Sequence, residues 1–492
     1  MTGRGRPRKA KSPEAHCVKS PPRETKQVKP LPKCPGKALV EEKKHDVKEE
    51  QKPKKREQKK PKHTDEKPPV SSTKTEEKSI KVKTGAGRGK SPEDFTEEIP
   101  KKREPKTPKA ITEAPVPQDI IEKKVDGNKI LSATLKELKI KTKERSEAAS
   151  LINRTVKTIM DHLKCNTTCF KDVEDLRTGS YYERLKISNP DEFDVMLTIP
   201  IDRVDIKPFS DDGAFYSVAL KRGKCCLDPF RKEDGTLPAS EILKEFREEV
   251  KKSVKKSEDV EVEKKKKGCP AVTLLITDAK GGSVPISLDI VLSLKVKSSW
   301  PSFTKDGLQI ERWLGTKVKQ DYKWKPYYLV SKYEGNGMLE SDGVLAKDVW
   351  RISFSHVEKG ILNNHGSEKT CCEEGGARCC RKDCLKLLKH LLGLLKSEDP
   401  SFNKFCSYHA KTTLLHACCS RTKDTEWEAS RLNHCFQLLL DNFEGHLRDR
   451  QLPNFFIPSQ NLLSGPSSKS CTSLARRIKE ERDKGFPIFK KR

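Results

Sequence analysis

The composition of the chain changes sharply near residue 128, and this change limits how much of it can form a packed domain. Residues 1–128 hold 17 of the 31 prolines, 35 basic and 21 acidic residues, and Phe95 as their single Phe, Tyr or Trp. Such a segment cannot bury enough apolar surface to offset the conformational entropy lost on folding. We therefore predict a disordered basic arm over residues 1–128 and folded structure from residue 129.

The arm shares the positive charge of the whole chain, which has 492 residues and a net charge of +29. Lysines and arginines that neutralise phosphates release counterions, so this charge favours nucleic acid as a partner. Arg4-Gly5-Arg6-Pro7-Arg8 resembles an AT-hook, in which an extended backbone places arginines in a narrow minor groove. We predict that the arm binds DNA or chromatin; the alternative is a tail that only aids solubility.

Two features lead us to expect neither a membrane-spanning protein nor a secretory signal. The most apolar run, around Leu385–Leu395, contains lysines and is shorter than the roughly 20 residues needed to span a bilayer. The N-terminus has charges with no apolar segment behind them, unlike a secretory signal. The 17 cysteines are therefore expected to be reduced, and clustered thiols in a reducing compartment more often bind metal than form disulfides.

From residue 129 onward, the hydrophobic pattern predicts a mixed α/β fold. Apolar residues spaced three to four apart between Leu131 and Leu163 indicate a long amphipathic helix, bent near Lys141–Arg145. Residues from about 383 onward are predicted to be mostly helical. The predicted strands are 195–199, 271–277 and 286–294, with a helix at 241–252.

Three acidic residues form the first candidate site. Glu192 and Asp194 lie two apart in a strand-like run, so both carboxylates project from one face. Asp289 lies in a second apolar strand, where a lone carboxylate is costly without a partner. Adjacent carboxylates repel each other unless a cation such as Mg²⁺ neutralises them, and sites with two metal ions suit phosphoryl transfer. The Gly179-Ser180 turn just before them can present N–H groups and a hydroxyl to a triphosphate.

This combination resembles the nucleotidyltransferase superfamily. Its pattern is a Gly-Ser turn, a strand with two acids and a later strand with a third, which here are residues 178–180, 192–195 and 288–290. Each piece alone is a weak signal, because an acid pair is more often a turn or an exposed strand edge. The resemblance implies that Glu192, Asp194 and Asp289 are catalytic and bind Mg²⁺ or Mn²⁺.

A second candidate site is a cluster of histidine and cysteine. The possible ligands are His365, Cys371, Cys372, Cys379, Cys380 and Cys384. One imidazole and three thiolates suffice for tetrahedral Zn²⁺, and a site with four protein ligands is structural rather than catalytic. We predict structural zinc here, held by the histidine and the first three cysteines, although spacing alone does not exclude the other two.

Together, the two sites resemble the family of vertebrate cyclic GMP–AMP synthases within the Mab-21 group. The resemblance covers about residues 130–492 and includes segments 179–196 and 350–359 and the spacing His-x5-Cys-Cys-x6-Cys from His365 to Cys379. It implies a bilobal nucleotidyltransferase fold with a long N-terminal spine helix. The catalytic core would occupy 129–300, and a helical Mab-21 lobe with a zinc loop at 365–384 would occupy 301–492.

The resemblance further implies an enzyme of innate immunity that is activated by double-stranded DNA. It would convert ATP and GTP into a cyclic dinucleotide with one 2′–5′ and one 3′–5′ linkage, form a homodimer on DNA, and occur in the cytosol and nucleus. One departure is Val291, where mammalian members tend to carry a threonine near the guanine. The implied nucleotide-binding residues are Thr178, Gly179, Ser180, Arg351, Ser353, Ser355, Glu358, Lys389, Ser407 and Tyr408, with Tyr408 stacking on a base.

Basic residues complete the implied interfaces. Lys382 and Lys386 lie four apart on a predicted helix, so both can contact one phosphate backbone. The implied DNA-binding residues are Lys139, Lys141, Lys143, Lys382 and Lys386. We found no base-reading motif, so binding should not depend on sequence. Arg203 and Arg222 match arginines that the family uses on the nucleosome acidic patch.

Three other functions were weighed. An RNA-activated 2′–5′ oligoadenylate synthetase would share the acids but lack the His/Cys cluster. A non-catalytic Mab-21 scaffold would be expected to lose one or more of the three carboxylates, all of which are present. A chromatin-binding protein with secondary catalysis stays open, because the basic arm is compatible with it.

Overall fold

A computed structural model describes residues 118–209, 213–221, 223–266, 268–277, 285–333, 335–368 and 370–490. Residues 1–117 of the predicted arm, including the AT-hook-like motif, lie outside this part of the chain. Helix α1 (Gln118–Glu137) begins before residue 129. This helix thus begins 11 residues before the predicted boundary.

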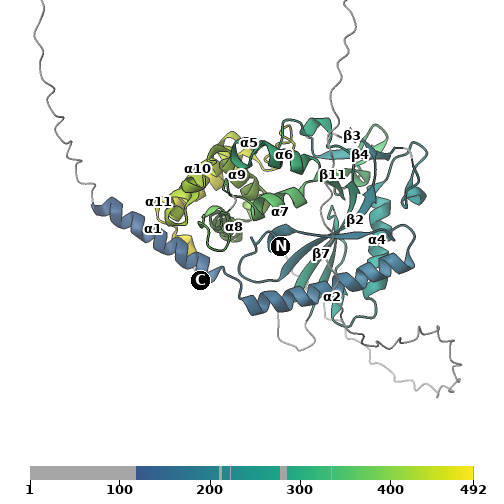
Figure 1. The fold of residues 1–492 in the computed structure, drawn as a ribbon, viewed down its shortest axis with the longest axis horizontal. Coiled ribbons are helices and arrows are strands. Elements are labelled where there is room, and N and C mark those ends of the chain that lie inside the picture. The colour runs from purple at the N-terminus through teal and green to yellow at the C-terminus, as the bar shows by residue number, and fades with distance from the viewer. Residues whose placement is uncertain are drawn as a thin grey trace, which may run out of the picture. The chain divides into compact units, whose positions relative to one another are not determined.

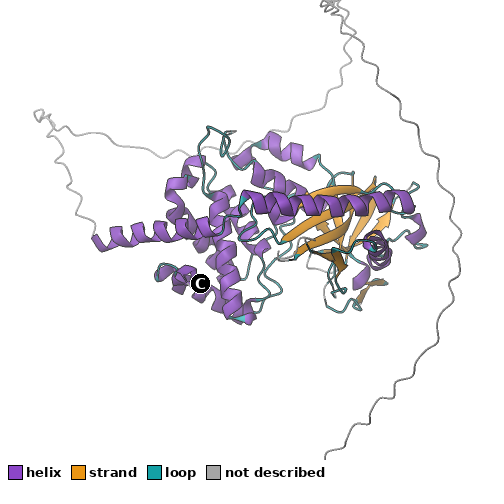
Figure 2. Cartoon of the chain, turned by 90° about the horizontal axis from the view of Figure 1, so that it is seen from below, coloured by secondary structure: helices purple, strands orange, loops and turns teal. Residues whose placement is uncertain are grey.

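The predicted long helix is in fact two helices, α1 and α2 (Thr142–Asn166), separated by residues 138–141. Leu138 and Ile140 are buried at this break, and the Leu138 carbonyl accepts a hydrogen bond from Ser188 N–H at 3.0 Å. Residues 138–141 are thus held against the catalytic core, directly before the bend predicted at Lys141–Arg145. Figure 2 shows the two helices following one another, with α2 alongside the strands.

The apolar face of α2 matches the predicted spacing. Its buried residues are Ala148, Ile152, Thr155, Val156, Ile159, Met160 and Leu163. This face packs against α4 (Ala239–Val254), whose own buried residues include Ile242, Phe246 and Val250. The buried faces of α2 and α4 belong to the same hydrophobic core as the strands, so helix α2 is an integral part of the catalytic lobe.

Two parallel strands, β2 (Glu192–Ile201) and β7 (Ile286–Val296), pair over ten positions at the centre of the sheet. Within the described residues the sheet has nine strands in the order β1-β2-β7-β8-β11-β4-β3, with β6 also pairing with β7 and β5 with β6. The strands lie on the right in Figure 1. The other strands of this sheet are β1 (Glu174–Thr178), β3 (Val204–Pro208), β4 (Phe215–Leu220), β5 (Val260–Val262), β6 (Ala271–Ile276), β8 (Tyr327–Ser331) and β11 (Trp350–Ser353).

The C-terminal part is mostly helical, as predicted, and lies on the left in Figure 1. Helix α8 (Arg381–Glu398) buries a stripe of leucines and packs against α9 (Ser407–Ser420) and α10 (Leu432–Asp449). No helix between residues 118 and 490 for which a structure is described combines the length and apolarity needed to cross a membrane. The remaining elements are α3 (Gly179–Tyr182), α5 (Glu311–Leu314), α6 (Thr316–Lys323), α7 (Ser355–Asn363), α11 (Ser468–Asp483) and the hairpin β9 (Glu340–Ser341) and β10 (Val344–Leu345).

Candidate active site and metal cluster

The three predicted acids gather at one end of the central strand pair. Asp194 on β2 stands opposite Asp289 on β7, and Glu192 lies two residues before Asp194. Neighbouring residues on adjacent strands project from the same face, so the three carboxylates share one side of the sheet. Glu192 and Asp194 are exposed and Asp289 is half-buried, which leaves the group open to a ligand.

The electrostatics of this group favour a bound cation. Surrounding protein atoms displace water from one side of the Asp194 carboxyl, and this desolvation raises its pKa to about 6. The charges of Asp289 and Glu192 add to the shift. The Lys186 ammonium forms an ion pair with Glu192 at 2.7 Å, which offsets part of the repulsion. The Thr273 hydroxyl donates a hydrogen bond to Asp289 at 2.7 Å.

The Gly-Ser turn lies directly beside these carboxylates. Thr178 ends β1 opposite Asp194, and the turn continues into the single-turn helix α3. Gly179 has a φ of 81°, and a β-carbon there would collide with the Asp194 side chain. Glycine is therefore required twice, once for the backbone conformation and once for the close approach.

A lysine from the helical lobe forms hydrogen bonds with the Gly-Ser turn and the residues that follow it. Lys389 Nζ on α8 donates to Ser180 Oγ at 3.0 Å and to the Leu185 carbonyl at 2.9 Å. Burial, together with nearby Lys411, lowers the pKa of Lys389 to about 8. The structure thus brings together the serine and lysine predicted to bind a triphosphate, although they lie 209 residues apart.

The other predicted nucleotide-binding residues lie on three neighbouring elements. Arg351 and Ser353 are on β11, Ser355 and Glu358 on α7, and Ser407 and Tyr408 at the start of α9. Burial and the adjacent Glu358 carboxylate raise the pKa of Tyr408, whereas nearby Arg351 lowers it, so these three residues are close neighbours. Tyr408 is half-buried and Ser407 is exposed.

Two residues of this region were missed by sequence reasoning. Lys411 on α9 forms ion pairs with Glu183 at 2.7 Å and with Glu358 at 3.0 Å. Both carboxylates are buried. No local signal marks the first pair, because Glu183 and Lys411 are 228 residues apart in the sequence.

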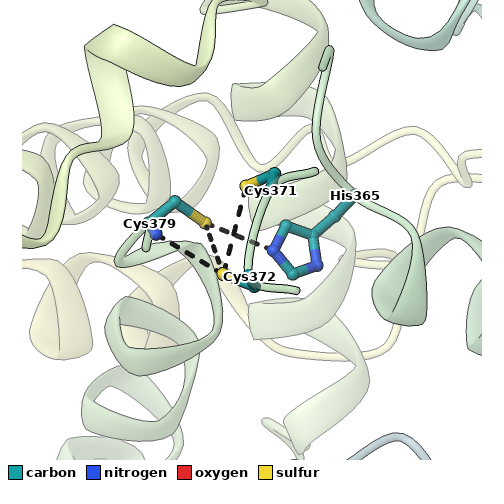
Figure 3. Close-up of side chains that lie close together, drawn as sticks. All are labelled: His365, Cys371, Cys372 and Cys379. Atoms are coloured by element: carbon teal, nitrogen blue, oxygen red, sulfur yellow. Dashed lines mark hydrogen bonds between the residues drawn. The ribbon is translucent and has the colours of Figure 1, made fainter. Parts of the chain in front are cut away.

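The second site is a compact group of four side chains, His365, Cys371, Cys372 and Cys379, whose ligand atoms all lie within 4.8 Å of one another (Figure 3). Cys379 Sγ lies 3.2 Å from Nε2 of His365 and 3.8 Å from Cys372 Sγ. His365 Nδ1 donates to the Leu362 carbonyl at 2.8 Å, which turns Nε2 toward the sulfurs.

The surrounding loop is fixed by a buried ion pair. Arg381 donates to Asp424 at 2.8 Å, and Asp424 also accepts from the N–H groups of Ser367 and Glu368, each at 3.0 Å. Cys380 and Cys384 lie apart from the cluster, in the helical core. Of the six candidate ligands, the structure therefore groups the predicted histidine and first three cysteines and leaves out Cys380 and Cys384.

The predicted DNA-binding lysines differ in their surroundings. Lys141 and Lys143 lie at the start of α2 with side chains 82% and 86% exposed, and Lys139 is exposed in the break before it. Lys386 pairs with Asp383 at 3.2 Å. Lys382 is more enclosed than predicted, because its ammonium donates to the Glu183 carbonyl at 3.0 Å and to Asn363 at 3.2 Å.

Arg203 is exposed on the surface of the catalytic lobe, shortly after the end of β2. It lines a hollow of about 410 Å³ together with Leu220, Lys221 and Arg231. All three basic side chains are exposed. Arg222, the other residue predicted to contact nucleosomes, lies outside the described residues.

A Gly-Ser turn beside three carboxylates on a parallel strand pair defines a nucleotidyltransferase. Residues 181–364 match the Mab-21 protein nucleotidyltransferase domain, and residues 380–480 match the Mab-21 protein HhH/H2TH-like domain. The chain is 45% identical over 368 residues to the cyclic GMP-AMP synthase of Mus musculus, which covers 73% of this chain and 70% of the relative. Identity to the Sus scrofa cyclic GMP-AMP synthase is 44% over 368 residues, 73% of this chain and 72% of the relative.

A more distant match is the cyclic GMP-AMP synthase-like receptor of Magallana gigas, 28% identical over 338 residues, 64% of this chain and 52% of the relative. The chain belongs to the cyclic GMP–AMP synthase family of Mab-21 nucleotidyltransferases.

Proposed function

We propose that this chain converts ATP and GTP into cyclic GMP–AMP when it binds double-stranded DNA, as a sensor of innate immunity. The observation that carries the proposal is the strand register that places Asp194 opposite Asp289, directly beside the Gly179-Ser180 turn. Family membership supports the same activity, because the similar mouse and pig proteins are cyclic GMP-AMP synthases.

The acidic site fits divalent cations. Its donors are hard carboxylate oxygens. The negative charges of Asp289 and Glu192 act on Asp194, and a cation would relieve this repulsion. We assign Mg²⁺ or Mn²⁺ to Glu192, Asp194 and Asp289. When bound, such ions stabilise negative charge on the transferred phosphoryl group and on the attacking and leaving oxygens.

The protein's own residues orient the substrates for the reaction. Ser180, Lys389 and Ser407 hold the triphosphate, with Thr178 and Gly179 shaping the turn. Arg351, Ser353, Ser355 and Glu358 contact the nucleotides, and the ring of Tyr408 stacks on a base. A ribose hydroxyl of one nucleotide then attacks the α-phosphate of the other and releases pyrophosphate. In the linear product, a ribose hydroxyl of the second nucleotide attacks the α-phosphate of the remaining triphosphate. This releases a second pyrophosphate and closes the ring, giving one 2′–5′ and one 3′–5′ linkage.

The His/Cys cluster fits Zn²⁺. Three sulfurs and one imidazole nitrogen within 4.8 Å make a complete tetrahedral set, so this metal would have a structural role. It would stiffen the loop that precedes α8, which carries Lys382 and Lys386. These lysines, with Lys139, Lys141 and Lys143, would contact phosphates along the duplex without reading its sequence.

DNA activates the enzyme in this proposal because it binds the catalytically aligned form more tightly. The contact between Lys382 and the Glu183 carbonyl supports such a link, since Glu183 directly follows α3. A homodimer on DNA and a location in the cytosol and nucleus complete the proposal. Light scattering on the DNA complex and imaging of the tagged full chain test these two parts.

The main test uses the full chain with ATP, GTP and Mg²⁺, with and without long double-stranded DNA, and mass spectrometry of the products. We expect a cyclic GMP–AMP mass only with DNA, and none from Asp194→Asn. A nuclease specific for 3′–5′ linkages should open the ring but leave the second linkage intact. Equal product without DNA would contradict activation, and bound DNA without product would instead favour a scaffold.

Chromatin binding is a second candidate function, and the hollow beside Arg203 favours it. Three exposed basic side chains line this hollow and suit a surface rich in carboxylates, such as the nucleosome acidic patch. Arg203→Glu should weaken binding to nucleosomes while binding to naked DNA of the same length stays the same. An equal loss on both ligands would remove this candidate.

A further inference from the structure

Lysines of the helical lobe contact the segment around the Gly-Ser turn at several points. Lys389 donates to Ser180 and to Leu185, Lys382 donates to the Glu183 carbonyl, and Lys359 donates to the Arg177 carbonyl at 2.8 Å. The remaining contact is the ion pair between Lys411 and Glu183. It differs from the others because it joins two charged side chains, both largely shielded from water.

Glu183 lies at the boundary between the turn and the core. It directly follows α3, and its N–H donates to the Gly179 carbonyl at 3.1 Å. Its carboxylate is fully buried, and its Oε2 has no hydrogen-bond partner among the described residues. Lys411 is therefore its main compensation, and breaking this pair would leave a buried charge unpaired.

The same ammonium also pairs with Glu358 on α7, so one lysine joins the turn to the proposed nucleotide pocket. Two buried carboxylates share this one ammonium, and the charge of Lys389 also acts on Glu183. This makes the position of Glu183, and with it the turn, sensitive to the charge at residue 411. A neutral side chain at either position should loosen the turn while most of the packing remains.

We propose that Glu183 is a positioning residue that holds the Gly179-Ser180 turn against Asp194 through its ion pair with Lys411. The proposal rests on the proposed function above, because it concerns the same active site. A turn that shifts by about 1 Å would misplace Ser180 relative to the carboxylates, and errors of that size can cost about a hundredfold in rate.

The test substitutes Glu183→Gln in the full chain. Lys411 and Glu358 then form a simple pair of opposite charges, so the variant should fold with an unfolding temperature close to that of the wild type. Hydrogen exchange measured by mass spectrometry should accelerate at least about tenfold in residues 179–186, because the local opening becomes easier. At saturating DNA, kcat should fall at least about tenfold while KM for both nucleotides changes by less than about twofold.

Two further variants separate positioning from general stability. Lys411→Arg keeps the charge and should retain slow exchange in the turn, whereas Lys411→Met should lose it. Glu444→Gln is the matched control, because Glu444 is also a buried glutamate, paired with Arg482 at 3.2 Å between α10 and α11. This control should leave both the exchange of residues 179–186 and kcat unchanged.

Each outcome decides the proposal. Unchanged exchange in Glu183→Gln would overturn it, as would faster exchange with unchanged kcat. The exchange measurement needs no product, so it still tests the ion pair if the wild-type chain makes no cyclic GMP–AMP. In that case the proposed function fails, while slow exchange in wild type and fast exchange in the variant would still show that Glu183 holds the turn.

Discussion

The metal cluster and the active site draw their residues from very different distances along the chain. The four side chains of the cluster fall between residues 365 and 379, and the sulfur–imidazole contact joins residues 14 positions apart. The active site instead joins Ser180 to Lys389 and Glu183 to Lys411, across 209 and 228 residues. The cluster therefore depends mainly on one loop, whereas the active site depends on how two lobes pack together.

This difference predicts that small backbone changes at the turn have the largest effects. Gly179→Ala should lower the rate of product formation at least about a hundredfold, because the new β-carbon collides with Asp194 and the turn must move. The rate is measured at saturating DNA and nucleotides.

Gly393→Ala is the matched control for that substitution. Gly393 lies within α8, and a β-carbon there meets no atom within 4 Å. We expect full activity and a gain in unfolding free energy of about 0.5–1 kcal/mol, because alanine favours the helix. More than half of the wild-type rate in Gly179→Ala would show that the turn tolerates displacement.

Lys382 lies just after the metal cluster and contacts the active-site segment at the Glu183 carbonyl. We expect it to cause a pH dependence of DNA affinity that is intermediate in size. Burial, reinforced by the charges of Arg184 and Lys386, lowers the pKa of Lys382 to about 8. The ammonium is charged below this value and neutral above it, so its attraction for DNA phosphates should decrease as pH rises from 7 to 9. Affinity should fall about threefold to tenfold, the range for one phosphate contact.

Lys382→Arg tests the cause, because arginine stays charged throughout this range. DNA affinity is measured by fluorescence anisotropy at pH 7 and pH 9 in both proteins. The variant should lose most of the pH dependence. The same pH dependence in both proteins would assign the effect to another group.

The smallest expected effect is on the salt dependence of DNA binding, from a lysine on helix α2 outside both sites. The Lys143 side chain is 86% exposed, and its ion pair with Glu147 is long, at 3.9 Å. Lys143→Ala should reduce the slope of log K against log salt by about 0.9, the value for one phosphate contact. Binding titrations between 50 and 200 mM salt measure this slope. An unchanged slope would remove Lys143 from the DNA interface.

Sequence patterns predicted the elements of the active site better than its electrostatics. The alternation around Glu192 and Asp289 placed both in strands, and the apolar spacing of α2 gave its buried face. The bend predicted near Lys141–Arg145 lies next to the observed break between α1 and α2, but the full interruption was not predicted, because Leu138 and Ile140 continue the apolar pattern. Lys411 and Glu183 escaped it because only tertiary packing brings them together.

For the metal cluster, the four predicted ligands are the four that the structure brings together, but spacing alone could not exclude two further cysteines. Cysteines 380 and 384 are as near in the sequence as the others, yet the start of α8 turns both into the helical core. The spacing of Lys382 and Lys386 predicted that both can contact one phosphate backbone, but it could not show that the Lys382 ammonium donates to the Glu183 carbonyl.

The most direct test of the account compares one variant from each region, Asp194→Asn and Cys372→Ser, by measuring DNA affinity and product formation on the same samples. The account assigns chemistry to the carboxylates and DNA binding to the metal-stiffened loop. Asp194→Asn should therefore bind DNA like the wild type and make no cyclic GMP–AMP. Cys372→Ser should lose DNA affinity at least about tenfold, and with it DNA-stimulated product, as expected when a metal site is disrupted. Cys372→Ser with wild-type DNA affinity and stimulation, or Asp194→Asn with an equal loss of DNA binding, would contradict this division of roles.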